Sequence, residues 1–124
     1  MKKQIVCANA PAAIGPYSQA VEINGMLFVS GQIGVDMATG QIPEDIAAQA
    51  ENVFKNMRSI LTEAGGSMDN VVKCGVFLKD MNEFAAMNEV YSKYFKEPYP
   101  ARTTIEAARL PKDLKVEIDA IAVL

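Results

Sequence analysis

The sequence predicts an α+β fold in which two helices pack on one face of a single β-sheet. Two stretches carry apolar residues at the spacing of an amphipathic helix, and the other regular stretches alternate apolar and polar residues as strands do. Their order is strand, hairpin, helix, strand, helix and hairpin. One sheet with both helices on one side buries every apolar stripe. The length of 124 residues favours one domain over residues 1–124.

The N-terminal part of the chain is expected to form a short strand and then a hairpin. Residues 4–7 fit the first strand, and the prolines and glycine of residues 9–16 predict a loop. Residues 17–23 alternate in the manner of a strand, and residues 26–30 form a second apolar run. The Asn24-Gly25 pair between them is typical of a tight hairpin turn.

The first long helix is expected after a segment that contains two glycines. Gly31-Gln32-Ile33-Gly34 permits either a β-bulge or a close approach of the backbone to a ligand. Acidic residues favour a helix start at Pro43-Glu44-Asp45, and Gly65-Gly66 is typical of a helix end. Between these limits, helical spacing predicts a buried stripe made of Ile46, Ala50, Val53, Phe54, Met57, Ile60, Leu61 and Ala64.

A further strand and a second helix are predicted next. Residues 71–79 read as a strand, with Val72, Cys74, Val76 and Leu78 on one face. Asp80 is suited to cap the helix that follows. The buried side of that helix is expected to consist of Phe84, Met87, Tyr91, Tyr94 and Phe95. Asn88 lies at the edge of this side, and residues 96–100 form a connector rich in proline.

The last part of the chain is expected to be a hairpin formed by residues 100–106 and 116–123. Residues 110–113 would be the loop between these two extended runs. In the second run, Val116, Ile118, Ala120 and Ala122 share one face, and Glu117, Asp119, Ile121 and Val123 share the other. One antiparallel register places Arg102 opposite Glu117, about 4.5–5.5 Å apart at Cβ. This register predicts a carboxylate-binding cation beside a carboxylate that can accept a proton.

Composition excludes several classes of protein. The net charge is −3 and the pI is about 4.9, which disfavours binding to a nucleic-acid backbone. The chain has no histidine, so Ser–His and Cys–His nucleophiles and the commonest metal ligand are missing. Cys7 and Cys74 are too few for a disulfide framework or a zinc site, and both are expected to be reduced structural thiols.

The apolar content points to a soluble protein that associates with copies of itself. No stretch approaches the length of a membrane span, and no apolar stretch of signal-peptide length follows the basic start, so a cytoplasmic protein is expected. Half of the residues are apolar. The face of the sheet that no helix covers carries both apolar and charged residues, which favours contact with other subunits.

Several motifs in this order resemble the reactive intermediate deaminase family, RidA, also called YjgF-like. They are residues 13–20 (AIGPYSQA), 30–33 (SGQI), 76–80 (VFLKD), 100–102 (PAR), 108–113 (ARLPKD) and 116–118 (VEI). The resemblance covers almost the whole chain. It implies a chorismate-mutase-like fold assembled as a homotrimer around a central β-barrel, with ligand clefts between subunits.

The resemblance also implies an activity. Members of the family hydrolyse short-lived 2-imino and enamine acids, such as 2-aminoacrylate or 2-iminobutanoate, to 2-keto acids and ammonia, with no metal or organic cofactor. The chain is therefore expected to be a hydrolase of the 2-iminobutanoate/2-iminopropanoate deaminase type. Its expected partners are a small imino or keto acid and two further copies of itself, with no nucleic acid and no membrane.

By position, Arg102 resembles the family's carboxylate-binding arginine and Glu117 its acidic residue at the imine. Glu117 would accept a proton from the attacking water, and Arg102 would hold the substrate carboxylate through two parallel hydrogen bonds. Tyr17, supplied by a neighbouring subunit, completes the catalytic set that the resemblance implies. The alternatives are a structural ion pair for Arg102 and Glu117 and interface packing for Tyr17.

The substrate-binding positions implied by the resemblance are Ser30, Gly31, Thr104 and Asn88, together with Arg102. Thr104 departs from the family because many members carry a cysteine at this position. The proposed hydrolysis needs no thiol nucleophile, so activity is expected to survive this change. Taken singly, Ser30 would be a hydroxyl at a strand end and Asn88 an amide on a helix surface.

The main alternative function is a non-enzymatic module that binds or senses small carboxylates such as keto acids. Arg102 would serve either function. Glu117 distinguishes them, because capture of an anion gains nothing from a neighbouring carboxylate. A holdase-type chaperone and an RNA-cleaving role are weaker alternatives, and the acidic charge and missing histidine argue against RNA cleavage.

Overall fold

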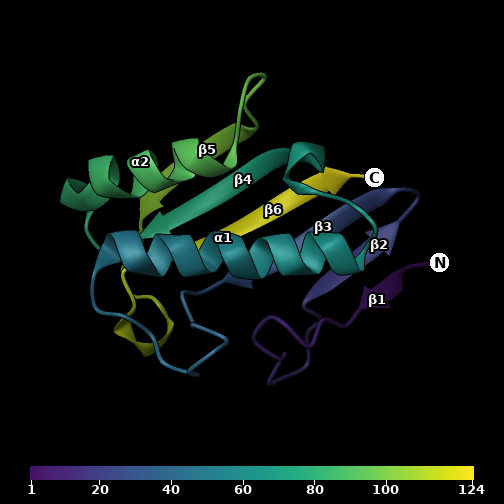
Figure 1. The fold of residues 1–124 in the computed structure, drawn as a ribbon, viewed down its shortest axis with the longest axis horizontal. Helices are drawn as coiled ribbons and strands as arrows, with labels where there is room; N and C mark the ends of the chain where they lie inside the picture. Colours follow the sequence, from purple (N-terminus) through teal and green to yellow (C-terminus); the bar gives the residue numbers. More distant parts are fainter.

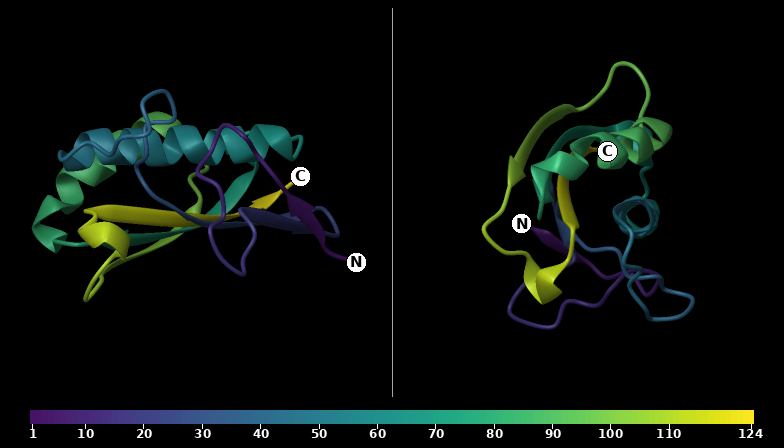
Figure 2. Two further views of the ribbon diagram at one scale, coloured as in Figure 1. Left: turned by 90° about the horizontal axis from the view of Figure 1, so that it is seen from below. Right: turned by 90° about the vertical axis from the view of Figure 1, so that its left-hand side faces the viewer.

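A computed structural model describes residues 1–124, and Figure 1 shows helices α1 and α2 lying across a six-stranded sheet. The strands are β1 (Lys3–Ile5), β2 (Ala20–Ile23), β3 (Met26–Gln32), β4 (Val71–Leu78), β5 (Ala101–Glu106) and β6 (Val116–Val123). The helices are α1 (Ile46–Glu63) and α2 (Phe84–Tyr94), with 3₁₀ turns at Met68–Asn70, Met81–Glu83 and Pro111–Asp113. Both helices lie on the same side of the sheet (Figure 2), which confirms the predicted α+β architecture.

The N-terminal hairpin forms where the Asn24-Gly25 pair predicted it. Strands β2 and β3 pair antiparallel, and both turn residues have positive φ, 52° at Asn24 and 77° at Gly25. Strand β2 begins at Ala20 rather than at residue 17. The buried side chain of Gln19 explains the shorter strand, because it exchanges hydrogen bonds of 2.7 and 2.9 Å with the backbone of Cys7 and thereby holds the preceding loop.

Helix α1 ends at the predicted glycines and begins at Ile46, just after the predicted start at Pro43-Glu44-Asp45. The Asp45 carboxylate accepts a hydrogen bond of 3.1 Å from the backbone of Ala48 and caps the N-terminus. At the other end Gly65 has a φ of +90°, and the Gly66 N–H donates to the Leu61 carbonyl at 2.8 Å, as in a Schellman motif. Most of the predicted apolar stripe is fully buried against the sheet.

Strand β4, helix α2 and strand β5 form a crossover unit. Asp80 accepts a hydrogen bond of 2.9 Å from Asn82 and caps the 3₁₀ turn that leads into α2. Because α2 carries the chain back along the sheet, β5 pairs parallel with β4. A register shift between Val71 and Lys73 turns Val71 inward, so Val72 is 47% exposed rather than facing the core with Cys74 as expected.

The predicted hairpin of residues 100–106 with residues 116–123 is wrong. The strand order is β1-β2-β3-β6-β4-β5, so β4 lies between β5 and β6 and pairs with both. Strand β4 is the more apolar partner and takes the interior position. Strand β5 has no fully buried residue and forms the edge of the sheet.

This order places Arg102 and Glu117 on opposite faces of the sheet. Arg102 pairs with Cys74, which is fully buried beneath the helices. Glu117 pairs with Phe77, whose side chain points to the other face because successive residues alternate. The predicted juxtaposition of Arg102 with Glu117 therefore does not occur within one chain.

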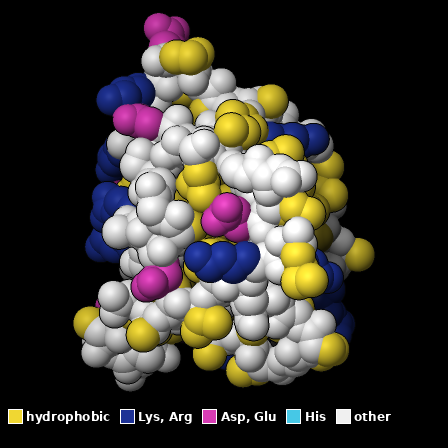
Figure 3. Space-filling model, turned by 90° about the vertical axis from the view of Figure 1, so that its right-hand side faces the viewer, with side chains coloured by type: hydrophobic (Ala, Val, Ile, Leu, Met, Phe, Trp, Pro, Cys, Tyr) yellow, Lys and Arg dark blue, Asp and Glu magenta, His cyan; other side chains and the backbone are white.

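No helix covers the second face of the sheet, which is called the open face below. It exposes apolar side chains of considerable size, including Phe28 (41%), Ile105 (46%) and Val123 (46%). Figure 3 shows one end of the molecule, where apolar side chains are exposed between charged ones. No helix of the chain has the length and apolar character needed to cross a membrane.

Candidate functional site

Arg102 lies at the edge of the sheet, on the face that helix α2 covers. Its side chain is half-buried, and Nη1 donates a hydrogen bond of 2.6 Å to Oδ1 of Asn88. The guanidinium carbon also lies 4.6 Å from the ring centre of Tyr91 and 5.3 Å from that of Phe84. Three residues of one helix thus hold the Arg102 side chain.

No carboxylate neutralises Arg102 within the chain. The three ion pairs of the protein join other residues, namely Lys79 with Asp113, Lys93 with Glu51 and Lys96 with Asp69. Arginine has five N–H donors, and the structure engages one of them with a protein acceptor. The guanidinium borders a pocket of about 460 Å³ lined by Asn88, Tyr91, Ser92, Tyr99, Pro100 and Arg102. This pocket can bind a small anion.

The groups beneath Arg102 are neutral at physiological pH. Burial raises the pKa of the Cys74 thiol to about 11, and it also raises the pKa of Tyr91 above its usual value. The hydroxyl of Tyr91 is buried next to the Cys74 thiol. Oγ1 of Thr104, which lies two residues beyond Arg102 on the same face of β5, is buried without a hydrogen-bond partner. The positive charge of Arg102 is thus the only formal charge in this pocket.

Glu117 lies on the open face, directly over Gly31 of the neighbouring strand β3. A Cβ at position 31 would clash with the carboxylate of Glu117, so glycine is required there for Glu117 to take this position. The carboxylate is half-buried, and no side chain or backbone donor of the chain bonds to it. Burial raises its pKa, and the negative charge of Asp119 raises it further. Such a carboxylate is a stronger base than an exposed one.

Asp119 follows Glu117 on the same face of β6 and also lies over a glycine. Its Oδ1 accepts a hydrogen bond of 2.9 Å from the backbone N–H of Gly75, and a Cβ at position 75 would lie 2.5 Å from that oxygen. One carboxylate of this pair is therefore anchored to the backbone, and the other is free.

Ser30 connects the Glu117 side of the sheet to the loop that carries Tyr17. Its hydroxyl donates a hydrogen bond of 2.6 Å to the carbonyl of Ser18, and its N–H donates to the carbonyl of Gln19 at 3.0 Å. Tyr17 is 53% exposed at the end of this loop. The hydroxyl of Ser30 thus has a structural role in the chain, which sequence reasoning did not anticipate.

The predicted site residues fall into two groups. Arg102 and Asn88 are in contact, with Thr104 on the same face, and they are called the arginine half-site below. Glu117 and Gly31 are in contact, and Ser30 with the Tyr17 loop lies beside them; they are called the glutamate half-site. Strand β4 separates the two halves within one chain.

Sequence reasoning missed the roles of three residues. Phe84 and Tyr91 were expected only in the helix core, although their spacing with Asn88 (i, i+4, i+7) places all three on one side of α2. The third is Gly75. An isolated glycine inside a strand signals a close approach of another group, which here is the carboxylate of Asp119.

Comparison with known proteins identifies the family. A family model described as "Endoribonuclease L-PSP" matches residues 7–124. A RutC family protein from Pasteurella multocida is 52% identical over 127 residues, which cover 99% of this chain and 98% of the relative. The 2-iminobutanoate/2-iminopropanoate deaminase of Escherichia coli K12 is 49% identical over 126 residues, with the same coverage.

Solved structures agree with this assignment. The YjgF gene product of Escherichia coli matches with a TM-score of 0.92 and 49% identity, and Escherichia coli TdcF with bound serine matches with a TM-score of 0.93 and 47% identity. Each match covers 98% of both chains. The chain belongs to the RidA/YjgF family, which confirms the resemblance of its motifs.

Proposed function

We propose that this protein hydrolyses short-lived 2-imino and enamine acids to 2-keto acids and ammonia. The observation that carries the proposal is the half-buried guanidinium of Arg102, which borders a pocket and has no carboxylate partner. Its planar fork of N–H donors matches the two oxygens of a substrate carboxylate. Binding there fixes the orientation of the substrate, and Asn88, which also lines the pocket, contributes a further polar contact.

Glu117 is the proposed general base. Water attacks the imine carbon and forms a C–O bond, while Glu117 accepts a proton from the water. Glu117 returns this proton to the nitrogen, and a second proton passes from the new hydroxyl to the nitrogen, so that the C–N bond breaks and ammonia leaves as the carbonyl forms. An enamine acid enters this sequence after a proton moves from its nitrogen to C3. The raised pKa of Glu117 supports this role because it makes the ionised carboxylate more basic. No step requires a histidine, a metal or an organic cofactor.

The two half-sites are proposed to meet between subunits. Because Arg102 and Glu117 face opposite sides of the sheet, one ligand can reach both only if two copies contribute. We infer a homotrimer with a central β-barrel, in which the open face of each sheet points inward and the arginine half-site of one copy lies beside the glutamate half-site of the next. The exposed Tyr17 and the exposed apolar residues of the open face support this assembly.

The names of relatives support the same reaction. Relatives of about half-identical sequence are named 2-iminobutanoate/2-iminopropanoate deaminase. Another relative was solved with bound serine, an amino acid that carries the carboxylate expected to bind Arg102. A binding module for small carboxylates is the second candidate function, and the same serine complex favours it. RNA cleavage is disfavoured by the net charge of −3 and the missing histidine.

The proposal is tested with 2-aminoacrylate made in situ by a pyridoxal-phosphate-dependent dehydratase acting on serine. Release of pyruvate is followed with and without the protein, and with Arg102→Ala and Glu117→Gln. The proposal predicts acceleration that both variants lose. Acceleration that persists in Glu117→Gln would remove the general-base role, and no acceleration by the folded wild-type protein would favour the binding module.

A further inference from the structure

Arg102 lies between two aromatic rings of helix α2. The guanidinium carbon is 4.6 Å from the ring centre of Tyr91 and 5.3 Å from that of Phe84, within the range of a cation–π interaction. The amide oxygen of Asn88, one helical turn from each ring residue, accepts from Nη1 at 2.6 Å. No carboxylate pairs with this half-buried arginine, and neutral groups surround it instead.

We propose that Phe84 and Tyr91 are positioning residues that hold the guanidinium of Arg102 in the absence of a carboxylate partner and so keep its charge available to an incoming carboxylate. The inference rests on the proposed carboxylate-binding role of Arg102. It assigns the ordering of Arg102 to Phe84, which does not line the pocket, and to Tyr91, which does.

The choice of aromatic rings has a physical reason. A carboxylate partner would occupy two N–H donors of Arg102 and neutralise its charge, so a ligand would have to displace it. A ring attracts the cation through its π-face and leaves the donors at the edge of the guanidinium free. Only the amide of Asn88 uses a donor. The side chain is thus held in place and is still able to bind an anion through two hydrogen bonds.

The ring of Tyr91 is itself rigidly held. It is 5% exposed, and its centre lies 5.7 Å from Phe54 in an edge-to-face arrangement and 4.7 Å from Phe95. The core therefore fixes the ring on which the guanidinium rests. Ordering Arg102 before a ligand arrives lowers the entropy that binding must overcome.

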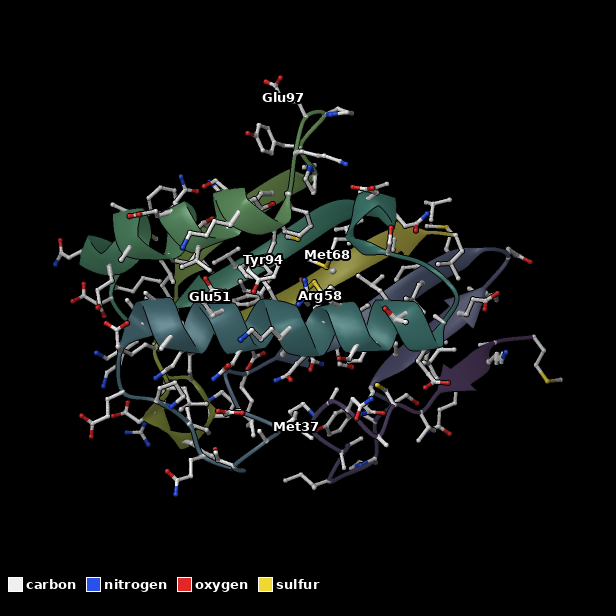
Figure 4. The ribbon with its side chains drawn as sticks, viewed as in Figure 1. Met37, Glu51, Arg58, Met68, Tyr94 and Glu97 are labelled. Carbon is white, nitrogen blue, oxygen red and sulfur yellow. The ribbon has the colours of Figure 1, made fainter.

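The same helix offers a matched control. Tyr94 contacts Arg58 at 5.5 Å from guanidinium carbon to ring centre, and its hydroxyl donates to Glu51 at 2.6 Å. Figure 4 shows Tyr94 pointing from α2 toward α1, between Glu51 and Arg58. This arginine–tyrosine pair does not border the Arg102 pocket. Tyr94→Leu thus removes the same chemistry from a place where it should not affect the ligand.

The first experiment measures binding of 2-ketobutanoate by calorimetry to the wild type, to Arg102→Ala and to four further variants. Phe84→Leu and Tyr91→Leu are expected to weaken binding by about 3- to 30-fold, the range of a cation–π contact. Tyr91→Phe keeps the ring and should bind within about twofold of the wild type, and so should Tyr94→Leu. Phe84 is only half-buried, so Phe84→Leu tests the inference even if Tyr91→Leu does not fold.

The second experiment needs no ligand. Nitrogen-15 relaxation of the Nε–Hε group reports how well the side chain of Arg102 is ordered. It should be ordered in the wild type, less ordered in Phe84→Leu and unchanged in Tyr94→Leu. Mobile Arg102 in the ligand-free wild type would overturn the inference and leave the proposed function standing.

The binding data separate the two claims further. If the wild type binds 2-ketobutanoate and Arg102→Ala does not, the carboxylate role stands. Unchanged affinity in both Phe84→Leu and Tyr91→Leu would then overturn the inference alone. If the wild type does not bind the keto acid, the carboxylate role fails and the inference fails with it, even where relaxation finds Arg102 ordered.

Discussion

Arg102 and Glu117 lie on opposite faces of the sheet, with strand β4 between their strands. Arg102 borders a pocket under helix α2, and Glu117 lies over Gly31 on the open face. A single chain therefore has its carboxylate-binding cation, Arg102, on one face of the sheet and its proposed base, Glu117, on the other. The proposed reaction needs both at one ligand, so it depends on the assembly of copies.

Arg102→Lys should keep the charge and lose much of the binding. The ammonium of lysine is a point charge and cannot form two parallel hydrogen bonds with a carboxylate. One charge-assisted hydrogen bond contributes about 1.5–3 kcal/mol, so KM for the imino acid should rise roughly 10- to 100-fold. Steady-state kinetics test this, with Arg109→Lys on an exposed loop as the control. Equal KM values for the wild type and Arg102→Lys would contradict the two-pronged contact.

Gly31→Ala should displace the carboxylate of Glu117. The added methyl group would occupy the space that this carboxylate fills, so kcat should fall at least about 10-fold, as for a misplaced general base. Gly75→Ala is the comparison, because its methyl group would meet Asp119 instead. Gly75→Ala should leave most of kcat intact and should change the pH dependence of the rate. A Gly31→Ala protein of normal melting temperature and full kcat would argue against Glu117 as the base.

The pH dependence of kcat/KM should report Glu117. A general base acts when ionised, so the rate should fall as the pH drops through the raised pKa of Glu117, at a higher pH than for an ordinary glutamate. Asp119→Asn keeps an acceptor for the Gly75 N–H and removes the charge, so this acid limb should move to lower pH. The limb should not reach the position of an exposed glutamate, because burial is the larger cause of the shift.

Other charges must be considered in this test. Strand β4 carries Lys73 on the same face, where it pairs with Ile121. Lys73 is therefore farther along the sheet from Glu117 than Asp119 is. Strand β3 carries no charged residue. Lys73→Met is therefore a suitable control, with a smaller effect expected than for Asp119→Asn. Titration of the Glu117 carboxyl by carbon-13 NMR measures the same shift without activity. If the acid limb of the kcat/KM profile does not move in Asp119→Asn, the proposed effect of the Asp119 charge on the pKa of Glu117 is refuted.

Thr104→Val should affect the stability of the protein and its affinity for the ligand in different directions. Oγ1 of Thr104 is buried without a hydrogen-bond partner, which costs about 1–3 kcal/mol. Valine has nearly the same shape, so the free energy of unfolding should be unchanged or should rise. Because Thr104 is a proposed substrate contact, affinity for 2-ketobutanoate should fall. Denaturant melts and calorimetry test the two effects, and an unchanged affinity would remove Thr104 from the site.

Most of the fold could be predicted because local signals define it. The Asn24-Gly25 turn and the Gly65-Gly66 end each depend on a few neighbouring residues, and both were found where the sequence placed them. The start predicted at Pro43-Glu44-Asp45 was correct to within a few residues, since the helix begins at Ile46 with Asp45 as its cap. The faces of the last strand were also correct, since alternation is independent of the pairing partner. Residue pattern therefore identified which side chains of β6 are buried.

The partner of each strand could not be read from the same pattern. Sequential strands are usually neighbours, which favoured a hairpin of β5 with β6. The crossover through α2 instead places β5 outside β4. Alternation in β5 says which residues share a face and does not say which face the helices cover. The position of Arg102 relative to Glu117 depends on this pairing, so the site was predicted residue by residue and not as a whole.

The most direct test of the account is a mixing experiment with Arg102→Ala and Glu117→Gln. Each variant alone should be nearly inactive. When the two are unfolded together and refolded as mixed trimers, some interfaces combine the intact Arg102 of one chain with the intact Glu117 of another. Random mixing in equal amounts should restore about one quarter of wild-type activity, because each closed-ring interface takes one half-site from each neighbour. If mass spectrometry verifies mixed trimers and activity stays at the level of the separate variants, the shared site is contradicted.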